Sequence, residues 1–253
     1  MRVEPIPAFR DNYIWALTDG RFAAIVDPGD ASPVLAYLAK NQLDLVAILA
    51  THHHADHVGG VAGILQHHPA TVFGPRGENI PTVAHPLAEG DEIELPGLGA
   101  RFRVLDIPGH TRGHIAYYGV NSVFCGDTLF ACGCGRLFEG TPAQMAASLA
   151  KLAALPDETK VYCGHEYTLA NIAFAKAVEP GNAALLARET EERNKRDRGF
   201  PTLPSRIGLE KATNPFLRAA VPAVAAAATQ HAARELGNAI DVFATLREWK
   251  NAF

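Results

Sequence analysis

The segment THHHADHVGG, at residues 51–60, gathers more metal-binding side chains than any other part of the chain. It holds four histidines and one aspartate within six consecutive positions. Neutral imidazoles suit zinc, iron or copper, and a carboxylate suits a hydrolytic metal. The segment follows the apolar run LVAILA, so it occupies a strand end and the loop beyond it. Alternate side chains of extended backbone point to one side, so we expect His52 and His54 to point together and His53 away.

Three further strand ends supply candidate ligands. His110 follows Pro108-Gly109, and Asp127 and His165 each follow a glycine at the end of an apolar run. A glycine lets the backbone turn sharply and come close to a site. Together with the first segment, these positions give five histidines and two aspartates, enough for two metal ions: His52, His54, Asp56, His57, His110, Asp127 and His165.

The elements that must position these ligands are short strands interleaved with helices. Apolar runs at 22–29, 45–53, 102–110, 115–119, 122–127 and 160–165 each predict a buried strand that ends in a turn. Ser32-Pro33 and Thr141-Pro142 each predict a helix start, with proline at the first helical position. Residues 117–124 predict a hairpin. We therefore expect a mixed sheet packed with helices.

The composition changes after about residue 166, where Ala-rich and charged helical patterns replace the strands. We predict a catalytic domain at 1–165 and a helical domain at 166–253. The breaks at Pro180-Gly181 and 199–208 separate the helices. Ser205-Arg206 and residues 210–218 predict an ordered loop that leads into the helices, in which we interpret Asn214-Pro215-Phe216 mainly as packing.

Composition restricts the class of protein. The chain has 253 residues, 48% of them hydrophobic, and a formal net charge of −4, which gives no basic field for nucleic acid. The N-terminus does not read as a signal peptide, and no apolar run is long enough to span a membrane. The few cysteines (Cys125, Cys132, Cys134 and Cys163) predict reduced thiols. We expect a cytoplasmic monomer that acts on a small molecule, with no nucleic-acid or membrane partner.

The order THHHADHVGG, PGHTRGH, CGDTLF, GCGR and CGHEYT resembles the metallo-β-lactamase superfamily, and most closely the glyoxalase II (hydroxyacylglutathione hydrolase) family. The resemblance covers essentially the whole chain, including IPAFRDNYIW and NPFLR. It implies an α/β fold, an αββα sandwich with a C-terminal helical domain. It also implies a ligand assignment without any departure from the pattern. His52, His54 and His110 would hold the first metal, and Asp56, His57 and His165 the second, with Asp127 as the bridge.

The resemblance implies a thioester hydrolase that converts S-D-lactoylglutathione to D-lactate and glutathione, the last step of methylglyoxal detoxification. Two ions can lower the pKa of a bridging water to about 7, so we expect a metal-bridged hydroxide to attack the thioester carbonyl. Asp56 and Asp127 are the expected catalytic residues, fixing the metals and handling the proton. Zinc is the first expectation for both divalent ions, with iron or manganese as alternatives.

The family pattern also implies substrate contacts at Arg136, Tyr167, Arg247 and Lys250. The R-x-x-K spacing of Arg247 and Lys250 puts both cations on one helix face. Relatives often have lysine at the position of Arg136 and tyrosine at that of Phe138, which leaves the glutathione contacts there open.

Other functions remain as alternatives. An iron-dependent persulfide dioxygenase shares H-x-H-x-D-H but would use one metal. A lactonase or β-lactamase would not explain the C-terminal half. A metal-binding scaffold without activity would have lost a ligand, and none is lost. Cys125 and Cys163 neighbour ligand loops, but seven better-placed ligands already suffice. His114 is expected to orient its neighbours by hydrogen bonding.

Overall fold

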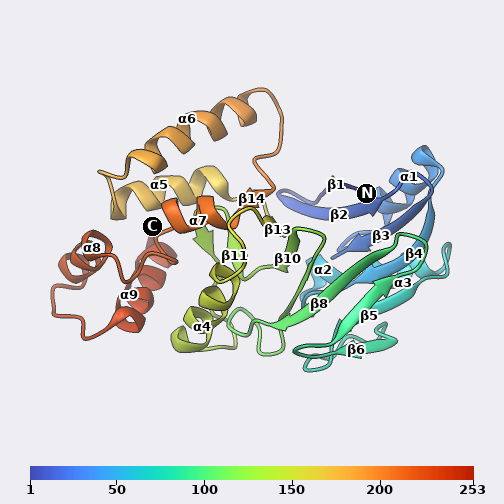
Figure 1. Ribbon diagram of the computed structural model, residues 1–253, viewed down its shortest axis with the longest axis horizontal. Helices are drawn as coiled ribbons and strands as arrows, with labels where there is room; N and C mark the ends of the chain where they lie inside the picture. Colours follow the sequence, from blue (N-terminus) through green and yellow to red (C-terminus); the bar gives the residue numbers. More distant parts are fainter. The chain divides into compact units, whose positions relative to one another are not determined.

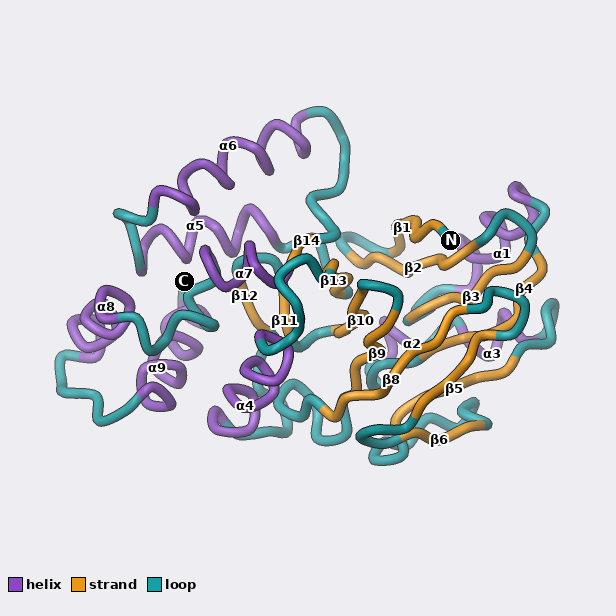
Figure 2. The backbone as a smooth tube through the Cα atoms, in the orientation of Figure 1, coloured by secondary structure: helices purple, strands orange, loops and turns teal.

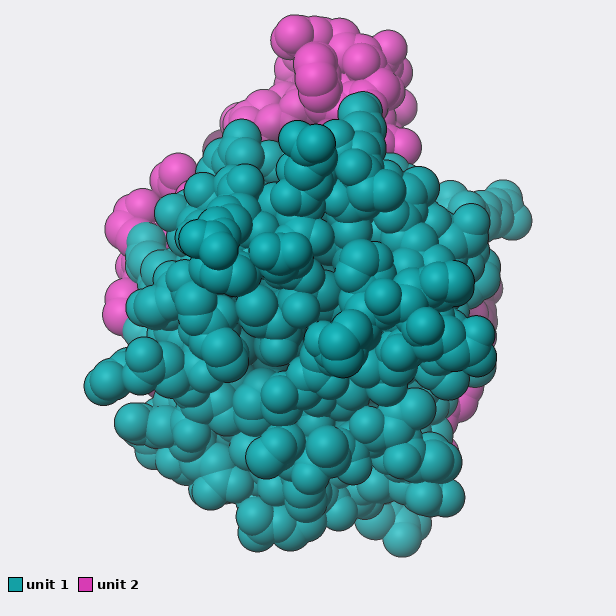
Figure 3. Space-filling model, turned by 90° about the vertical axis from the view of Figure 1, so that its right-hand side faces the viewer, with its two compact units in different colours: residues 1–106, 111–126 teal, residues 107–110, 127–253 magenta.

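The computed structural model describes residues 1–253 and divides into two compact units, coloured separately in Figure 3. Unit 1 contains residues 1–106 and 111–126, and unit 2 contains residues 107–110 and 127–253. The domain boundary that we predict at residue 166 stays a prediction.

A mixed six-stranded sheet forms the first part of unit 1 (Figure 1). Its three N-terminal strands pair antiparallel, and the later strands pair parallel, as the predicted mixed sheet requires. In spatial order the strands are β1 (Arg2–Ala8), β2 (Asn12–Thr18), β3 (Phe22–Val26), β4 (Asp44–Leu49), β5 (Thr71–Pro75) and β6 (His85–Leu87).

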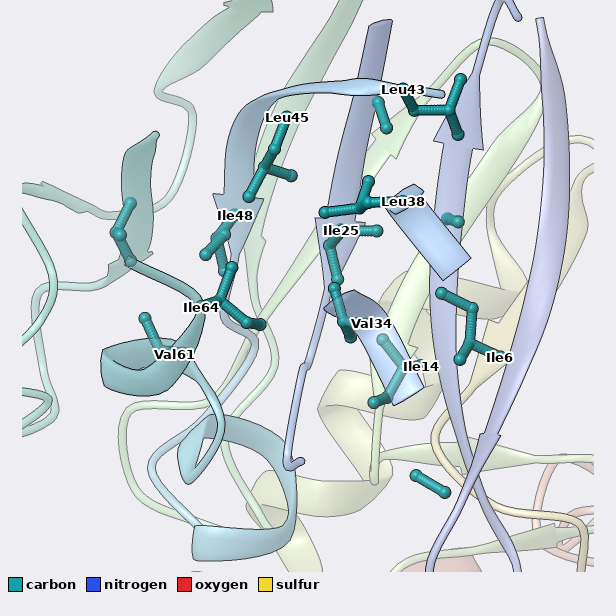
Figure 4. Packing of buried hydrophobic residues seen from close by; sticks show 14 residues of the cluster. Ile6, Ile14, Ile25, Val34, Leu38, Leu43, Leu45, Ile48, Val61 and Ile64 are labelled. Carbon is teal, nitrogen blue, oxygen red and sulfur yellow. The ribbon is translucent and has the colours of Figure 1, made fainter. Parts of the chain in front are cut away.

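Three helices accompany this sheet: α1 (Ala31–Asn41), α2 (Ala55–Val58) and α3 (Val61–Leu65). Figure 4 shows the core that strand residues such as Ile25 and Ile48 form with Val34 and Leu38 of α1 and Ile64 of α3. The predicted cap of α1 was wrong by two residues. Asp30 is the N-cap, because its carboxylate accepts the N–H of Ser32, which is already helical.

The other strands of unit 1 pair antiparallel in the order β10 (Ser122–Gly126), β9 (Ile115–Gly119), β8 (Ala100–Asp106) and β7 (Glu92–Leu95). The predicted hairpin at 117–124 is confirmed, since β9 and β10 are joined by Val120 and Asn121. Both turn residues have φ near +50°, as a tight two-residue hairpin turn requires.

Unit 2 is mostly helical (Figure 2). Its strands form two antiparallel pairs, β11 (Leu129–Phe130) with β12 (Gly133–Cys134) and β13 (Lys160–Cys163) with β14 (Ser205–Arg206). Its helices are α4 (Pro142–Ala153), α5 (Thr168–Val178), α6 (Ala183–Asp197), α7 (Ile207–Thr213), α8 (Pro222–Ala232) and α9 (Ala239–Ala252).

The start of α4 confirms the predicted cap at Thr141, which forms a capping box with Gln144. The predicted loop at 205–206 and 210–218 was wrong in part, because residues 210–213 belong to α7 (Ile207–Thr213). A seven-residue helix that contains Gly208 has little intrinsic stability, so the local residue pattern does not predict it. Burial of Ile207 and Glu210, both fully inaccessible, holds it in place. None of the helices has the length and apolar character needed to cross a membrane.

Candidate metal centre

His52 and His54 leave the end of β4 with their imidazoles facing one another, as the alternation predicts. His52 Nε2 lies 3.1 Å from His54 Nδ1. His53 points away from them, and its Nδ1 lies 3.0 Å from Glu78 Oε2. Metal–nitrogen bonds are about 2.0–2.1 Å long, so nitrogens 3.1 Å apart would subtend about 100° at a shared ion. This separation suits two ligands of one near-tetrahedral ion.

Asp56 and His57 follow on the short helix α2. Asp56 Oδ2 accepts a hydrogen bond from Asn12 Nδ2 at 3.0 Å, and it lies 3.6 Å from His57 Nε2. With bonds of similar length, that separation corresponds to about 120° at an ion. Asp56 is the more accessible partner, with 42% of its side chain exposed, whereas the side chain of His57 is 1% exposed.

Asp27 is a site residue that our sequence analysis missed. It follows β3 in the DPG turn and is 4% exposed. Its carboxylate accepts the Thr51 N–H and the Thr51 hydroxyl, both at 2.7 Å, and the His57 Nδ1–H at 3.1 Å. This contact fixes the His57 tautomer that presents the Nε2 lone pair. The only sequence signal was an acidic residue at the end of an apolar strand.

Thr51 extends this orienting effect to His52. Because the Thr51 hydroxyl donates to Asp27, its oxygen accepts from His52 Nδ1 at 3.1 Å, and His52 Nε2 is left as a lone pair. Ligand atoms of Asp27, His52 and His57 all lie within 4.8 Å of one another. His114 donates from Nδ1 to the Ile115 carbonyl at 3.0 Å and stacks on His52 at 4.6 Å, and its expected role in orienting neighbours by hydrogen bonding stays a prediction.

Glu78 is a second residue that sequence reasoning missed. Its carboxylate, 2% exposed, contacts the His53 imidazole and accepts the Thr111 hydroxyl and the Gly113 N–H. It thereby ties the loop after β4 to the loop before β9. The sequence around it, PRGEN, has no signal that distinguishes it from a surface loop.

The remaining candidate ligands, His110, Asp127 and His165, are brought together in unit 2. Asp127 Oδ2 lies 3.5 Å from His110 Nε2 and 3.2 Å from His165 Nε2. His110 Nδ1 donates to the Arg136 carbonyl at 2.9 Å, which leaves its Nε2 as a lone pair. All three residues are at least nine-tenths buried. One carboxylate oxygen thus lies at ligand-pair distance from two imidazoles, as a bridging ligand requires.

Two glycines allow these approaches. Gly126, the last residue of β10, has φ +47°, and a Cβ there would lie 2.3 Å from Thr51 Oγ1. A Cβ at Gly135 would lie 1.9 Å from the carbonyl oxygen of Asp127. Neither position can hold a larger residue without moving a ligand loop.

Aromatic rings surround the ligands of unit 2. Tyr167 stacks parallel on His165 at 4.7 Å, and Phe130 meets both rings edge-on. Phe138 contacts His110 edge-on at 5.2 Å and is 62% exposed. Tyr167 is 36% exposed, so its ring reaches the surface beside a candidate ligand.

Arg136, Arg247 and Lys250 form a group of cations in unit 2. Burial lowers the pKa of Lys250, and the charges of Arg247 and Arg136 lower it further. The side chain of Arg136 is exposed, whereas Arg247 is only 6% exposed. Arg247 donates through Nη1 to the Cys134 carbonyl and through Nε to Asn251, and its Nη2 donors make no hydrogen bond within the protein. The group is electropositive and suits an anionic ligand.

Comparison with known proteins gives two family matches. The metallo-β-lactamase superfamily model matches residues 8–165, and the model of the hydroxyacylglutathione hydrolase C-terminus matches residues 166–253. The chain is 55% identical to a hydroxyacylglutathione hydrolase of Nitrosomonas eutropha, over 99% of this chain and 98% of that protein. Other curated relatives carry the same name.

Two solved structures share the fold. ETHE1 from Myxococcus xanthus superposes with a TM-score of 0.66 at 28% identity, covering 86% of this chain and 84% of that one. TTHA1623, solved in a di-iron-bound form, gives a TM-score of 0.60 at 30% identity and covers 85% of this chain and 100% of that one. The expected metallo-β-lactamase fold with a C-terminal helical region is therefore confirmed.

Proposed function

Because the chain belongs to the hydroxyacylglutathione hydrolase family of the metallo-β-lactamase superfamily, we propose that it hydrolyses S-2-hydroxyacylglutathione thioesters. The proposed main substrate is S-D-lactoylglutathione, which would give D-lactate and glutathione in the last step of methylglyoxal detoxification. Beyond the family, the observation that carries the proposal is the set of His and Asp ligand pairs at 3.1–3.6 Å.

The family and the donor set indicate divalent metal ions. We propose that His52, His54 and His110 hold one ion, that Asp56, His57 and His165 hold a second, and that Asp127 bridges them. The fit is supported by the orientation of the imidazoles. In His52, His57 and His110, the Nδ1–H donates a hydrogen bond, so Nε2 carries the lone pair that can bind a metal ion. When bound, the ions polarise the substrate carbonyl and make water nucleophilic at neutral pH.

The zinc assignment is part of the proposal, with iron or manganese as alternatives. Imidazole and carboxylate donors accept all three metals, so geometry and availability decide. The solved structure of TTHA1623 in a di-iron-bound form supports iron as an alternative to zinc.

The protein's own residues have separable roles in this mechanism. Asp27 and Thr51 hold His52 and His57 in their ligating tautomers. Asp127 is more deeply buried than Asp56, so we assign to it the fixed spacing of the ligands. Asp56 is reachable by solvent, and its Oδ2 is held by Asn12. We therefore assign to Asp56 the transfer of the proton that leaves the attacking water.

The cation group is the proposed site for the carboxylates of glutathione. Arg247 Nη2 and the Lys250 ammonium are the proposed direct contacts, and Arg136 adds charge and a donor fork. Tyr167, stacked on His165, is the proposed contact for the part of glutathione near the thioester. The proposed cation contacts are to carboxylates away from the reacting carbonyl, so these cations would bind substrate and transition state alike.

We further propose that the chain acts in the cytoplasm as a monomer. All four cysteines are buried and none forms a disulfide, as is usual for proteins of a reducing compartment. Sedimentation of the purified chain tests the monomer.

The decisive experiment measures thiol release from S-D-lactoylglutathione together with metal content per chain. We expect rapid hydrolysis and nearly two ions per chain. A thioester of the same acyl group on a thiol that lacks the glutathione carboxylates is the control, and it should show a much higher KM. A protein with full metal content that hydrolyses neither thioester would refute the proposed function.

A further inference from the structure

The hairpin formed by β11 and β12 is buried throughout. Leu129 pairs with Cys134 and Phe130 with Gly133, so Ala131 and Cys132 form the turn. All six residues are buried, and Cys132 has φ +55°, which a side chain other than glycine rarely adopts. Polar backbone groups in such a turn need partners inside the protein, because water does not reach them.

Side chains of the C-terminal helices supply these partners one by one. Asn171 of α5 donates to the Ala131 carbonyl at 3.0 Å, and Glu210 of α7 accepts the Cys132 N–H at 2.8 Å. Asn214, the C-cap of α7, donates to the carbonyls of Phe130 and Gly133, at 3.1 and 2.9 Å. Arg247 of α9 donates to the Cys134 carbonyl at 2.7 Å. Each residue from 130 to 134 is therefore held by a side chain.

The partners are themselves joined in a buried network. Glu210 accepts from Asn214 Nδ2 at 3.0 Å and from Arg188 Nη2 at 2.7 Å, and Arg188 also donates to Thr213. Arg188 and Glu210 are 3% and 0% exposed. A buried ion pair adds little net stability compared with apolar residues of the same size. Its presence here suggests a role in fixing one backbone conformation.

The ends of this hairpin lead directly to the site. Asp127 lies two residues before β11, and Arg136 lies two residues after β12. The strands remain tied beyond the hairpin by the bond from Gly135 N to the Thr128 carbonyl at 3.1 Å. The Arg136 carbonyl accepts the Nδ1–H of His110 at 2.9 Å. A shift of the hairpin would therefore move a carboxylate ligand, a cation of the substrate site and the orientation of an imidazole ligand together.

We propose that Asn171, Glu210, Asn214 and Arg247 are positioning residues that set the β11–β12 hairpin and, through it, Asp127, Arg136 and His110. The role given to these last three residues rests on the proposed function. The C-terminal helices would then serve the metal centre as well as the binding of glutathione. Asn214, first interpreted as packing, is the central member because its amide group spans the turn.

The test compares Asn214→Ala with Asn182→Ala. Asn182 is the matched control, because its Nδ2 also donates to a backbone carbonyl of unit 2, that of Ala212 at 2.9 Å, without touching the hairpin. Asn171→Ala, which removes one bond to the turn, is a milder second variant should Asn214→Ala fold poorly. All variants are made in the full chain, and thermal unfolding gives the loss of stability in each.

The first readout is amide hydrogen exchange in the metal-stripped chain. In Asn214→Ala and Asn171→Ala we expect the amides of residues 129–135 to exchange about tenfold faster than in Asn182→Ala. The variants are compared at temperatures that lie equally far below their unfolding midpoints. The second is the dissociation constant for zinc, measured against a chelator. We expect it to rise about 10- to 100-fold in Asn214→Ala, as happens when groups that orient ligands are lost. The third is kcat, which should fall with lactoylglutathione and with the small control thioester alike.

Equal exchange and equal zinc affinity in Asn214→Ala and Asn182→Ala would overturn the positioning role. Inactivity of the unsubstituted chain towards every glutathione thioester would instead overturn the proposed function. In that case the exchange and zinc measurements would still decide the present inference, since neither depends on turnover.

Discussion

The substitution Asp27→Asn replaces one carboxylate oxygen by an NH₂ group. Asp27 orients two candidate ligands, His57 directly and His52 through Thr51. The Asp27 carboxylate accepts three hydrogen bonds, two from Thr51 and one from His57, and is 4% exposed. Asparagine has one acceptor oxygen, so its NH₂ group must face a donor in either orientation. If the amide oxygen keeps the Thr51 N–H, the NH₂ group faces His57 Nδ1 and drives the proton to Nε2. His57 could then no longer bind a metal through Nε2.

The size of the effect follows from the bond that is lost. A hydrogen bond to a charged group contributes about 1.5–3 kcal/mol. Since about 1.4 kcal/mol corresponds to a factor of ten, metal affinity should fall by about 10- to 150-fold. The Thr51 hydroxyl must also turn, which disturbs His52 and favours the upper half of this range. We expect Asp27→Asn to bind metal more weakly, and we expect excess metal to restore part of the kcat that the variant loses.

The assay is competition of Asp27→Asn with a chelator for zinc, with nitrogen NMR of the metal-stripped chain to assign the His57 tautomer. Asp19→Asn is the matched control, because Asp19 accepts the N–H groups of Arg21 and Phe22 at an exposed turn without contacting a histidine. We expect the control to keep full zinc affinity. If both variants bind zinc equally and His57 keeps its proton at Nδ1, the orienting role of Asp27 is wrong.

Three further predictions concern the ligand bridge and the cation group. Asp127→Ala should abolish turnover in a folded chain and lower metal content at both positions, as measured by elemental analysis; retention of two ions with normal kcat would contradict the bridge. Lys250→Ala should raise KM about tenfold with kcat unchanged, whereas Arg247→Ala should raise KM and lower kcat, because Arg247 also holds the Cys134 carbonyl. The third concerns pH. Lys250 carries its charge only at pH values below its pKa, which burial lowers. As pH is raised, KM should therefore begin to increase before the pH reaches about 10.4, the pKa of an ordinary lysine. Lys250→Arg should remove this rise, and a KM profile that is the same in both proteins would show that Lys250 does not contact the substrate.

The candidate ligands could be predicted because metal chemistry restricts them to a few residue types. His52 and His54 follow an apolar strand at alternate positions, and this local pattern was enough to predict that their imidazoles meet. Asp127 and His165 follow a different local pattern, in which a glycine and then a candidate ligand come at the end of an apolar run. The hairpin at 117–124 and the capping box of α4 were likewise local signals that the structure confirms.

The groups that orient the ligands were not predictable in this way. Asp27 acts on Thr51, 24 positions away, and Glu78 acts on Thr111, 33 positions away. An aspartate after a strand and a glutamate in a loop are common, so nothing in their surroundings separates them from surface residues. The cap of α1 failed for a related reason. Asp30 and Ser32 are both good caps, and only the path of the chain decides between them.

Arg247 shows why residue type and spacing alone misjudge such a side chain. Its place in R-x-x-K predicts a cation that shares one helix face with Lys250, and the family pattern implies that it contacts the substrate. In the structure it is buried, and one guanidinium donor is committed to a carbonyl 113 positions away. A lysine could not satisfy both demands, because its single ammonium lacks the planar fork that lets Nη1 hold Cys134 while Nη2 stays available for a carboxylate. Arg247→Lys should therefore weaken the hairpin even where it preserves the charge, because the bond to Cys134 and the proposed substrate contact use different guanidinium donors.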